Sequence, residues 1–163
     1  MTTIAVTGHM DLSESSIPLV RDALREHLKP YARYELTGIS CIAKGSDSLF
    51  AEAVLEVGGR LVVVIPSLDY RQKKVKPDHA ETFDRLVAAA AEVIVLPHEA
   101  ANRQAYEAAN RTLLQRADRL VAVWDGKPPS GKGGGTADTV EEAREAAMPV
   151  DVVWPEGAER QRA

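Results

Sequence analysis

The apolar run at residues 60–66, RLVVVIP, constrains the fold of this chain more than any other feature. Its apolar residues follow one another without the polar alternation of a strand that has one face in water. A strand of this kind has both faces covered, as in a parallel sheet flanked by helices. The run therefore predicts a buried strand in an α/β protein.

Similar short runs recur along the chain, and most are followed by a segment with the period of an amphipathic helix. The pattern predicts a Rossmann-like, doubly wound α/β fold with a mainly parallel sheet of about six strands and helices on both faces. The expected strands are residues 4–7, 34–43, 60–66, 92–97, 119–124 and 150–154, and the expected helices are residues 16–31, 46–57, 80–91, 102–117 and 136–147. Residues 67–79 form a long polar and basic connection. We expect one domain over residues 1–155 and a polar, frayed tail over residues 156–163.

Composition narrows the class of protein. A chain of 163 residues with 45% apolar and 27% charged residues is typical of one soluble globular domain. The net charge of -4 argues against extensive contact with a nucleic-acid backbone, so we expect no nucleic-acid partner. A single cysteine, Cys41, excludes an internal disulfide and fits a core position in a reducing compartment. The N-terminus lacks the pattern of a secretion signal, and no apolar run approaches the roughly 20 residues of a membrane span. We expect a cytoplasmic protein with no membrane partner.

Three of the expected strand-to-helix loops carry small and polar residues: TGHMD, AKGSD and GKGGGTADT. In a parallel sheet these loops lie at one edge, where open α/β proteins bind ligands. The candidate binding residues of the first two loops are Thr7, Gly8, His9, Lys44, Gly45, Ser46 and Asp47. Two alternatives stay open, since His9 is also explained as an ordinary loop histidine and Asp47 as a helix-capping acid. Pro66, Ser67, Asp69 and Tyr70 are expected near the rim, and the cluster Arg71, Lys73, Lys74 and Lys76 is either a solvated loop or a source of charge for a phosphate.

The glycine-rich loop indicates a phosphate cradle. Gly133, Gly134 and Gly135 leave backbone N–H groups open to an anion. Thr136 adds a hydroxyl at the start of a helix whose dipole favours negative charge. Asp138, in the first turn, is placed either to cap the helix or to contact a ribose hydroxyl. The simpler alternative is a glycine turn that leads into a Thr-capped helix.

Other kinds of site find less support in the sequence. Residues 126–132 spell G-x-x-x-x-G-K, but Gly133 stands where a Walker-type loop needs Ser or Thr for magnesium. Pro128 and Pro129 also restrict the loop and remove donors. The four histidines are not closely paired, and no CxxC pair or GxSxG elbow occurs. We expect no metal, no cofactor and no covalent nucleophile.

The stretches TGHMDL, GISCIAKGSDSLFAEAVLEVGGRLVVVIP and GGGTADTVEEAREAAMPVDVVW resemble the SLOG superfamily. This group contains the LOG phosphoribohydrolases, which activate cytokinins, and the Rossmann domain of DNA-processing protein A. The resemblance covers nearly the whole chain, to about Trp154. It implies a Rossmann-like fold that binds nucleotides or nucleotide-derived ligands, with Gly134, Gly135 and Thr136 at the phosphate and Gly8, Gly45 and Asp47 on the other side of the pocket.

The resemblance allows two functions. The first is a protein that binds a nucleotide or a nucleotide-derived ligand, as a sensor or accessory protein. The alternative is a LOG-like hydrolase of the N-glycosidic bond of nucleoside 5′-monophosphates, with Asp138 and Arg111 as candidate catalytic residues. LOG-type hydrolases resemble P-G-G-x-G-T-x-x-E, and Thr139 stands here at the position of the glutamate. Binding is therefore the leading hypothesis, and the resemblance also suggests a homodimer.

Overall fold

The centre of the protein is one parallel sheet. The computed structural model describes residues 1–33, 35–128 and 135–161. Its six strands lie in the order β4-β3-β2-β1-β5-β6, and each neighbouring pair is parallel. The strands are β1 (Thr2–Gly8), β2 (Leu36–Ser40), β3 (Arg60–Ile65), β4 (Glu92–Val95), β5 (Arg119–Val123) and β6 (Val150–Val152). The predicted Rossmann-like α/β class is confirmed.

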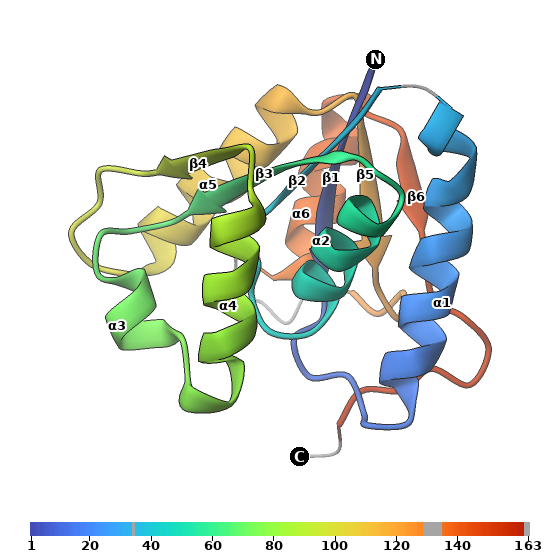
Figure 1. Cartoon of the computed structure of the whole chain (residues 1–163), viewed down its shortest axis with the longest axis horizontal. Coiled ribbons are helices and arrows are strands. Elements are labelled where there is room, and N and C mark those ends of the chain that lie inside the picture. The colour runs from blue at the N-terminus through green and yellow to red at the C-terminus, as the bar shows by residue number, and fades with distance from the viewer. Residues whose placement is uncertain (34, 129–134, 162–163) are drawn as a thin grey trace.

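Helices cover both faces of this sheet (Figure 1). One face carries α1 (Ser16–Leu28), α2 (Ser46–Glu56) and α4 (Pro77–Ala89), and the other carries α5 (Arg103–Arg116) and α6 (Thr136–Glu145). A 3₁₀ turn, Lys29–Arg33, extends α1, and a short helix, α3 (Tyr70–Lys74), precedes α4. Within the described residues, no helix has the length and apolar character needed to cross a membrane.

The alternation of side chains along β1 explains the two layers of core. Ile4 and Val6 are buried in the cluster that contains Phe50 of α2. Ala5 points to the opposite face, where it belongs to the cluster of Ala109 and Leu113 of α5. Because successive residues of a strand face opposite sides, only apolar residues at consecutive positions bury both faces.

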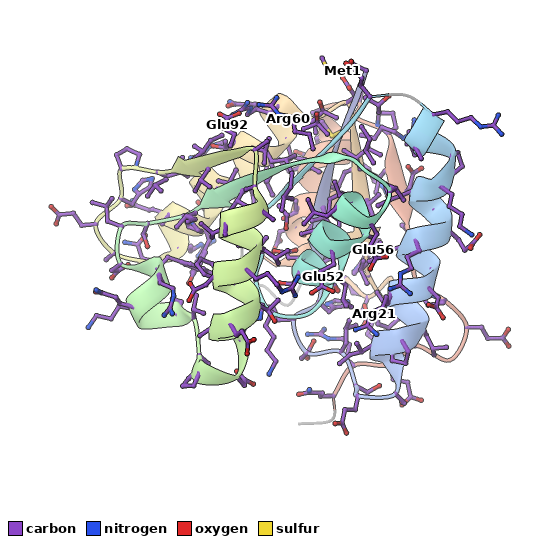
Figure 2. All side chains as sticks on the ribbon, viewed as in Figure 1. Met1, Arg21, Glu52, Glu56, Arg60 and Glu92 are labelled. Carbon is purple, nitrogen blue, oxygen red and sulfur yellow. The ribbon has the colours of Figure 1, made fainter. Side chains whose placement is uncertain are left out.

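The direction of the strands defines where a ligand is expected. Met1, Arg60 and Glu92 lie together at the edge where β1, β3 and β4 begin (Figure 2). The carboxyl ends of the strands therefore meet at the opposite edge. The chain proceeds from β1 to β2, β3 and β4 on one side and from β5 to β6 on the other. This reversal of strand order between β1 and β5 is the topological switch point, where open α/β sheets bind ligands.

Two segments differ from the sequence-based expectations. The polar connection after β3 contains helix α3, which buries Tyr70. The tail after Pro155 does not fray over its described part: the Ser13 amide donates to the Glu159 carbonyl at 2.9 Å, and the Gln161 amide donates to the Asp11 carbonyl at 2.6 Å. Its partners lie about 150 positions away in the chain, so the local composition of the tail gave no sign of this pairing.

Candidate functional site

A cavity of about 610 Å³ lies at the carboxyl edge of the sheet, at the switch point between β1 and β5. Residues from all three expected loops line it: Thr7, Gly8 and His9 after β1, Asp47 after β2, and Gly135, Thr136 and Asp138 at the start of α6. The parallel order of the strands explains this convergence, because each loop leaves the same edge. Gly133 and Gly134 lie outside the described residues.

His9 connects the ends of β1 and β5 beside the cavity. Its backbone amide donates to the Val123 carbonyl at 3.2 Å, and its Nε2 accepts from the Asp125 amide at 3.1 Å. The edge of its ring meets the Trp154 ring, with centroids 5.6 Å apart. Burial lowers the pKa of His9 and nearby Arg160 lowers it further, against the opposing effect of Asp125. The neutral imidazole is therefore a structural link that also borders the cavity.

Gly8 and Ser46 bring the start of α2 against the end of β1. A Cβ on Gly8 would lie 2.4 Å from the Ser46 Cβ and 2.9 Å from the Val123 Cβ. Ser46 is fully buried, and its hydroxyl donates to the His9 carbonyl at 2.8 Å. Gly8 thus permits close packing beside the cavity, while Ser46 holds the two loops together and does not line it.

The loop from β2 to α2 places only some of its expected residues at the cavity. Ile42 has a φ of 46°, which is uncommon for a β-branched residue. Both of its backbone polar groups are hydrogen-bonded. Its amide donates to the Ser40 hydroxyl at 3.0 Å, and its carbonyl accepts from His79 Nε2 at 3.0 Å. The exposed side chain of Lys44 pairs with Asp78 of α4 and is not among the cavity residues. The loop therefore presents Cys41, Ala43 and Asp47 to the cavity rather than the expected lysine.

Asp47 is the acidic residue of this loop, in the first turn of α2. Its Oδ2 accepts one long hydrogen bond, 3.4 Å, from the Ala43 amide. Burial raises the pKa of Asp47 to about 7, and the Ala43 amide offsets this only in part. The carboxyl therefore exchanges a proton near neutral pH, unlike an ordinary exposed aspartate.

The start of α6 borders the cavity on the β5 side. Asp138 Oδ2 accepts from the Gly135 amide at 3.2 Å, and the Thr139 hydroxyl donates to the Gly135 carbonyl at 3.2 Å. Asp138 therefore caps the helix and occupies one of the amides expected to meet an anion. The amides of Thr136 and Ala137 belong to the first turn, whose N–H groups have no partner within the helix. These amides and the Thr136 hydroxyl are the groups available to an anion here.

Arg111, the other candidate catalytic residue, does not join Asp138. It is exposed on α5 and is absent from the lining of the cavity. Its neighbour Asn110 lines the cavity instead. One residue along a helix rotates a side chain by about 100°, so these two positions face different surroundings.

Asp125 and Arg160 line the cavity and were not expected from the sequence. Burial opposes ionisation of Asp125, whereas the hydrogen bond from the Lys127 amide and the nearby Arg160 guanidinium favour it, and the pKa of Asp125 lies below its usual range. Arg160 pairs with Asp11 at 2.8 Å and approaches Asp125 at 4.0 Å. Because Arg160 reaches the site through the paired C-terminal segment, no local motif marks it. Asp125 had a signal, its position directly after a strand at the expected edge.

The side of the cavity toward β3 is aromatic. Tyr70 of α3 and Tyr106 of α5 both line it, and their rings meet edge to face with centroids 6.4 Å apart. Pro66 lines it as expected, whereas Ser67 and Asp69 do not; Asp69 instead accepts from the Ser67 hydroxyl at 2.7 Å and the Ala101 amide at 2.8 Å. From the basic cluster, Lys74 and Lys76 reach the cavity, Lys73 does not, and Arg71 pairs with Asp84 at 2.8 Å.

The similarity of this chain to known proteins is found in solved structures. No family model matches the sequence, and no curated protein matches it. DNA processing protein A from Streptococcus pneumoniae is similar with a TM-score of 0.65 and 20% identity, over 93% of this chain and 50% of that chain. DNA processing protein A from Helicobacter pylori gives 0.65 and 17%, over 93% and 64%. The Moco carrier protein from Chlamydomonas rheinhardtii gives 0.54 and 21%, over 93% and 74%.

The chain shares the fold of these proteins. Sequence identities of 17–21% show a shared fold and no more. The fold implied by the resemblance in the sequence is therefore confirmed. The chain spans half of the Streptococcus pneumoniae protein and 64% of the Helicobacter pylori protein, so it matches part of each.

The expectation that nucleic acid is excluded as a partner is wrong. The Helicobacter pylori protein, which shares this fold, is described by its single-stranded DNA binding mode. The expectation depended on the net charge of -4, which averages over the whole surface. The potential inside a groove depends on the local side chains rather than on the total. Four cationic side chains line this cavity together with four aspartates: Lys74, Lys76, Lys127 and Arg160, and Asp11, Asp47, Asp125 and Asp138.

Proposed function

We propose that this SLOG-type protein binds a nucleotide or a nucleotide-derived ligand in the cavity between the carboxyl ends of β1 and β5. The observation that carries the proposal is the composition of this one cavity. It has a helix start and cationic side chains on the β5 side and tyrosines on the β3 side. A phosphorylated ligand with a flat ring needs both kinds of surface.

The phosphate lies in this proposal at the start of α6. The free amides of its first turn and the Thr136 hydroxyl supply donors, and the helix dipole favours an anion there. Lys127 and Arg160 line the same cavity and supply positive charge. Asp138 remains engaged with the Gly135 amide as the helix cap, which leaves the Thr136 and Ala137 amides for the ligand.

The ring of the ligand lies in this proposal on the aromatic side. Tyr106, which is partly exposed, offers ring surface, and the nearly buried Tyr70 packs against its ring. Pro66, Ala109 and Leu113 add apolar surface around them. Stacking of a base on an aromatic side chain contributes roughly 1–3 kcal/mol and tolerates different bases. This side therefore supports affinity for a base more readily than for a sugar or a simple phosphate.

Substitutions at the start of α6 test the proposal. Thr136→Ala removes one donor to a charged group, so we expect nucleotide affinity to fall about tenfold in calorimetry. Gly135→Val is expected to weaken binding further without unfolding the protein, because a Cβ there has its nearest neighbour, Asp138 Oδ2, at 3.7 Å. Thr82→Ala on α4 is the matched control, since Thr82 does not line the cavity. Unchanged affinity in both α6 variants would place the ligand elsewhere.

Two further measurements test related functions. A single-stranded oligonucleotide tests whether the cavity accepts a nucleotide within a strand, as the comparison with DNA processing protein A suggests.

Release of free base from nucleoside monophosphates tests the LOG-like hydrolase. We expect no release, because Arg111 is exposed on α5 away from the cavity and Asp138 serves as a cap. Base release that is lost in Asp138→Ala would contradict this expectation. The homodimer stays a prediction that light scattering can check.

A further inference from the structure

Among the described residues, Asp47 contributes a carboxyl group to the aromatic side of the cavity. Cys41, Tyr70 and Tyr106 line the cavity with it. Tyr70 is only 7% exposed, and burial raises the pKa of the Cys41 thiol and of the Tyr70 hydroxyl, so both stay neutral. Asp47 is thus the group on this side that changes charge near neutral pH.

The contacts of Asp47 leave its carboxyl available to a ligand. Its carboxyl accepts one hydrogen bond from the described residues, that of the Ala43 amide at 3.4 Å, and no cationic group among them contributes to its pKa of about 7. Other titratable or charged groups share the cavity with Asp47: His9 and Asp11 after β1, Cys41 after β2, Tyr70, Lys74 and Lys76 in and after α3, and Tyr106 of α5. His79 of α4 packs against the same loop but does not line the cavity. Its Nε2 is within hydrogen-bond distance of the Ile42 carbonyl at 3.0 Å and the Ser48 hydroxyl at 3.3 Å.

The order of the strands sets the distance between Asp47 and the phosphate end. Asp47 follows β2, the start of α6 follows β5, and both strands are neighbours of β1. Two strand spacings amount to about 10 Å. A nucleoside monophosphate with its phosphate at α6 therefore presents the far edge of its base to Asp47, and its sugar lies between. This placement favours recognition of the base over chemistry at the glycosidic bond.

We propose that Asp47, in its protonated form, reads the edge of a base that offers a hydrogen-bond donor beside an acceptor, as adenine does. This inference rests on the proposed function, since it assigns the base side of the same cavity. A neutral carboxyl group carries one O–H donor and one carbonyl acceptor side by side, so it pairs with an amino group and the adjacent ring nitrogen. An ionised carboxylate only accepts, and it suits a pair of donors such as the N1–H and amino group of guanine.

The inference is tested by calorimetry with adenosine 5′-monophosphate and guanosine 5′-monophosphate at pH 6 and pH 8. If only protonated Asp47 binds adenine, affinity for the adenine nucleotide falls about tenfold across this range. Asp47→Asn keeps one donor and one acceptor, so it should bind the adenine nucleotide without this step, and the wild-type to variant ratio removes the titration of the phosphate itself. Asp47→Leu should lose most of the affinity. Asp78→Asn, an exposed first-turn aspartate of α4, is the matched control.

The outcomes separate this inference from the proposed function. If neither monophosphate binds, both are overturned. If both bind and respond to Thr136→Ala, but Asp47→Leu binds the adenine nucleotide as tightly as wild type or Asp47→Asn keeps the full pH step, only the inference about Asp47 is overturned. Melting temperatures of both Asp47 variants show whether they are folded, and Asp47→Asn decides the question if Asp47→Leu is not.

Discussion

Two aspartates in the first turns of helices have different surroundings in this protein. Asp138 accepts the Gly135 amide at 3.2 Å at the start of α6, in the manner of an ordinary cap. Asp47 accepts the Ala43 amide at 3.4 Å, too long to offset burial, and its pKa rises to about 7. The same residue type at the same kind of helix position therefore caps a helix in one case and exchanges a proton near neutral pH in the other.

Asp47→Asn should make the stability of the unliganded protein less dependent on pH. In the unfolded chain the pKa of an aspartate is about 3.9, so the raised pKa means that the folded state binds the proton more tightly. The stabilising contribution of protonated Asp47 is full below about pH 4 and is lost as pH rises through about 7. Urea unfolding should show Asp47→Asn gaining stability relative to wild type between pH 4.5 and pH 8. A constant difference would mean that Asp47 ionises equally in both states.

At the scale of the elements, two loops are joined at the backbone. Gly45, directly before α2, has a φ of +90°, and a Cβ there would lie 2.8 Å from the Met10 carbonyl oxygen and 2.9 Å from that of His9. The Ser46 amide and hydroxyl both donate to the His9 carbonyl, at 3.3 and 2.8 Å. The β2–α2 loop therefore positions the residues after β1, including one wall of the cavity.

A pair of glycine substitutions separates backbone strain from this contact. Gly58 after α2 has a φ of +79°, and a Cβ there meets nothing within 4 Å. Gly58→Ala should cost about 1–2 kcal/mol of unfolding free energy from the left-handed conformation alone. Gly45→Ala adds the collision with Met10, so we expect a clearly larger loss in urea unfolding and weaker ligand binding. Equal losses would show that the two loops yield to the added methyl group.

At the scale of the whole molecule, the C-terminal segment joins the far end of the chain to the first loop. Leu12 and Arg160 form an antiparallel bridge, and the Glu159 amide donates to the Ser16 hydroxyl at 2.7 Å. This pairing holds the loop between β1 and α1 and places Arg160 at the cavity. One segment thus serves both the stability of that loop and the charge of the site.

Removal of residues 157–163 and Arg160→Ala should have different effects. The deletion removes the Glu159 carbonyl that accepts the Ser13 amide, so hydrogen exchange at Ser13 should become faster and the melting temperature should fall. In Arg160→Ala the backbone pairing remains, and loss of a partly exposed ion pair costs only about 0–1 kcal/mol. Ser13 should stay protected there, while affinity for a phosphorylated ligand falls. Fast exchange at Ser13 in Arg160→Ala would show that the side chain, and not the backbone, holds the segment.

The sequence by itself determined the fold and the edge at which the site lies. Continuous apolar runs such as residues 61–65 bury both faces of a strand, and their alternation with helices leaves a parallel sheet as the solution. The loops with Gly8, Asp47 and Gly135 could be expected at one cavity because every strand of such a sheet ends at the same edge.

Only the tertiary structure decided which side chains reach that cavity. Lys44 pairs with Asp78, and Arg111 is exposed, although the sequence pointed to both. Tyr106 and Arg160 enter from a helix face and from the chain end, where no motif marks them. The direction of a side chain depends on rotation about a helix and on partners distant in sequence, and local patterns carry little information about either. The charge that a ligand meets depends on the same placements. The net charge of the chain was therefore not sufficient to exclude a nucleic-acid partner.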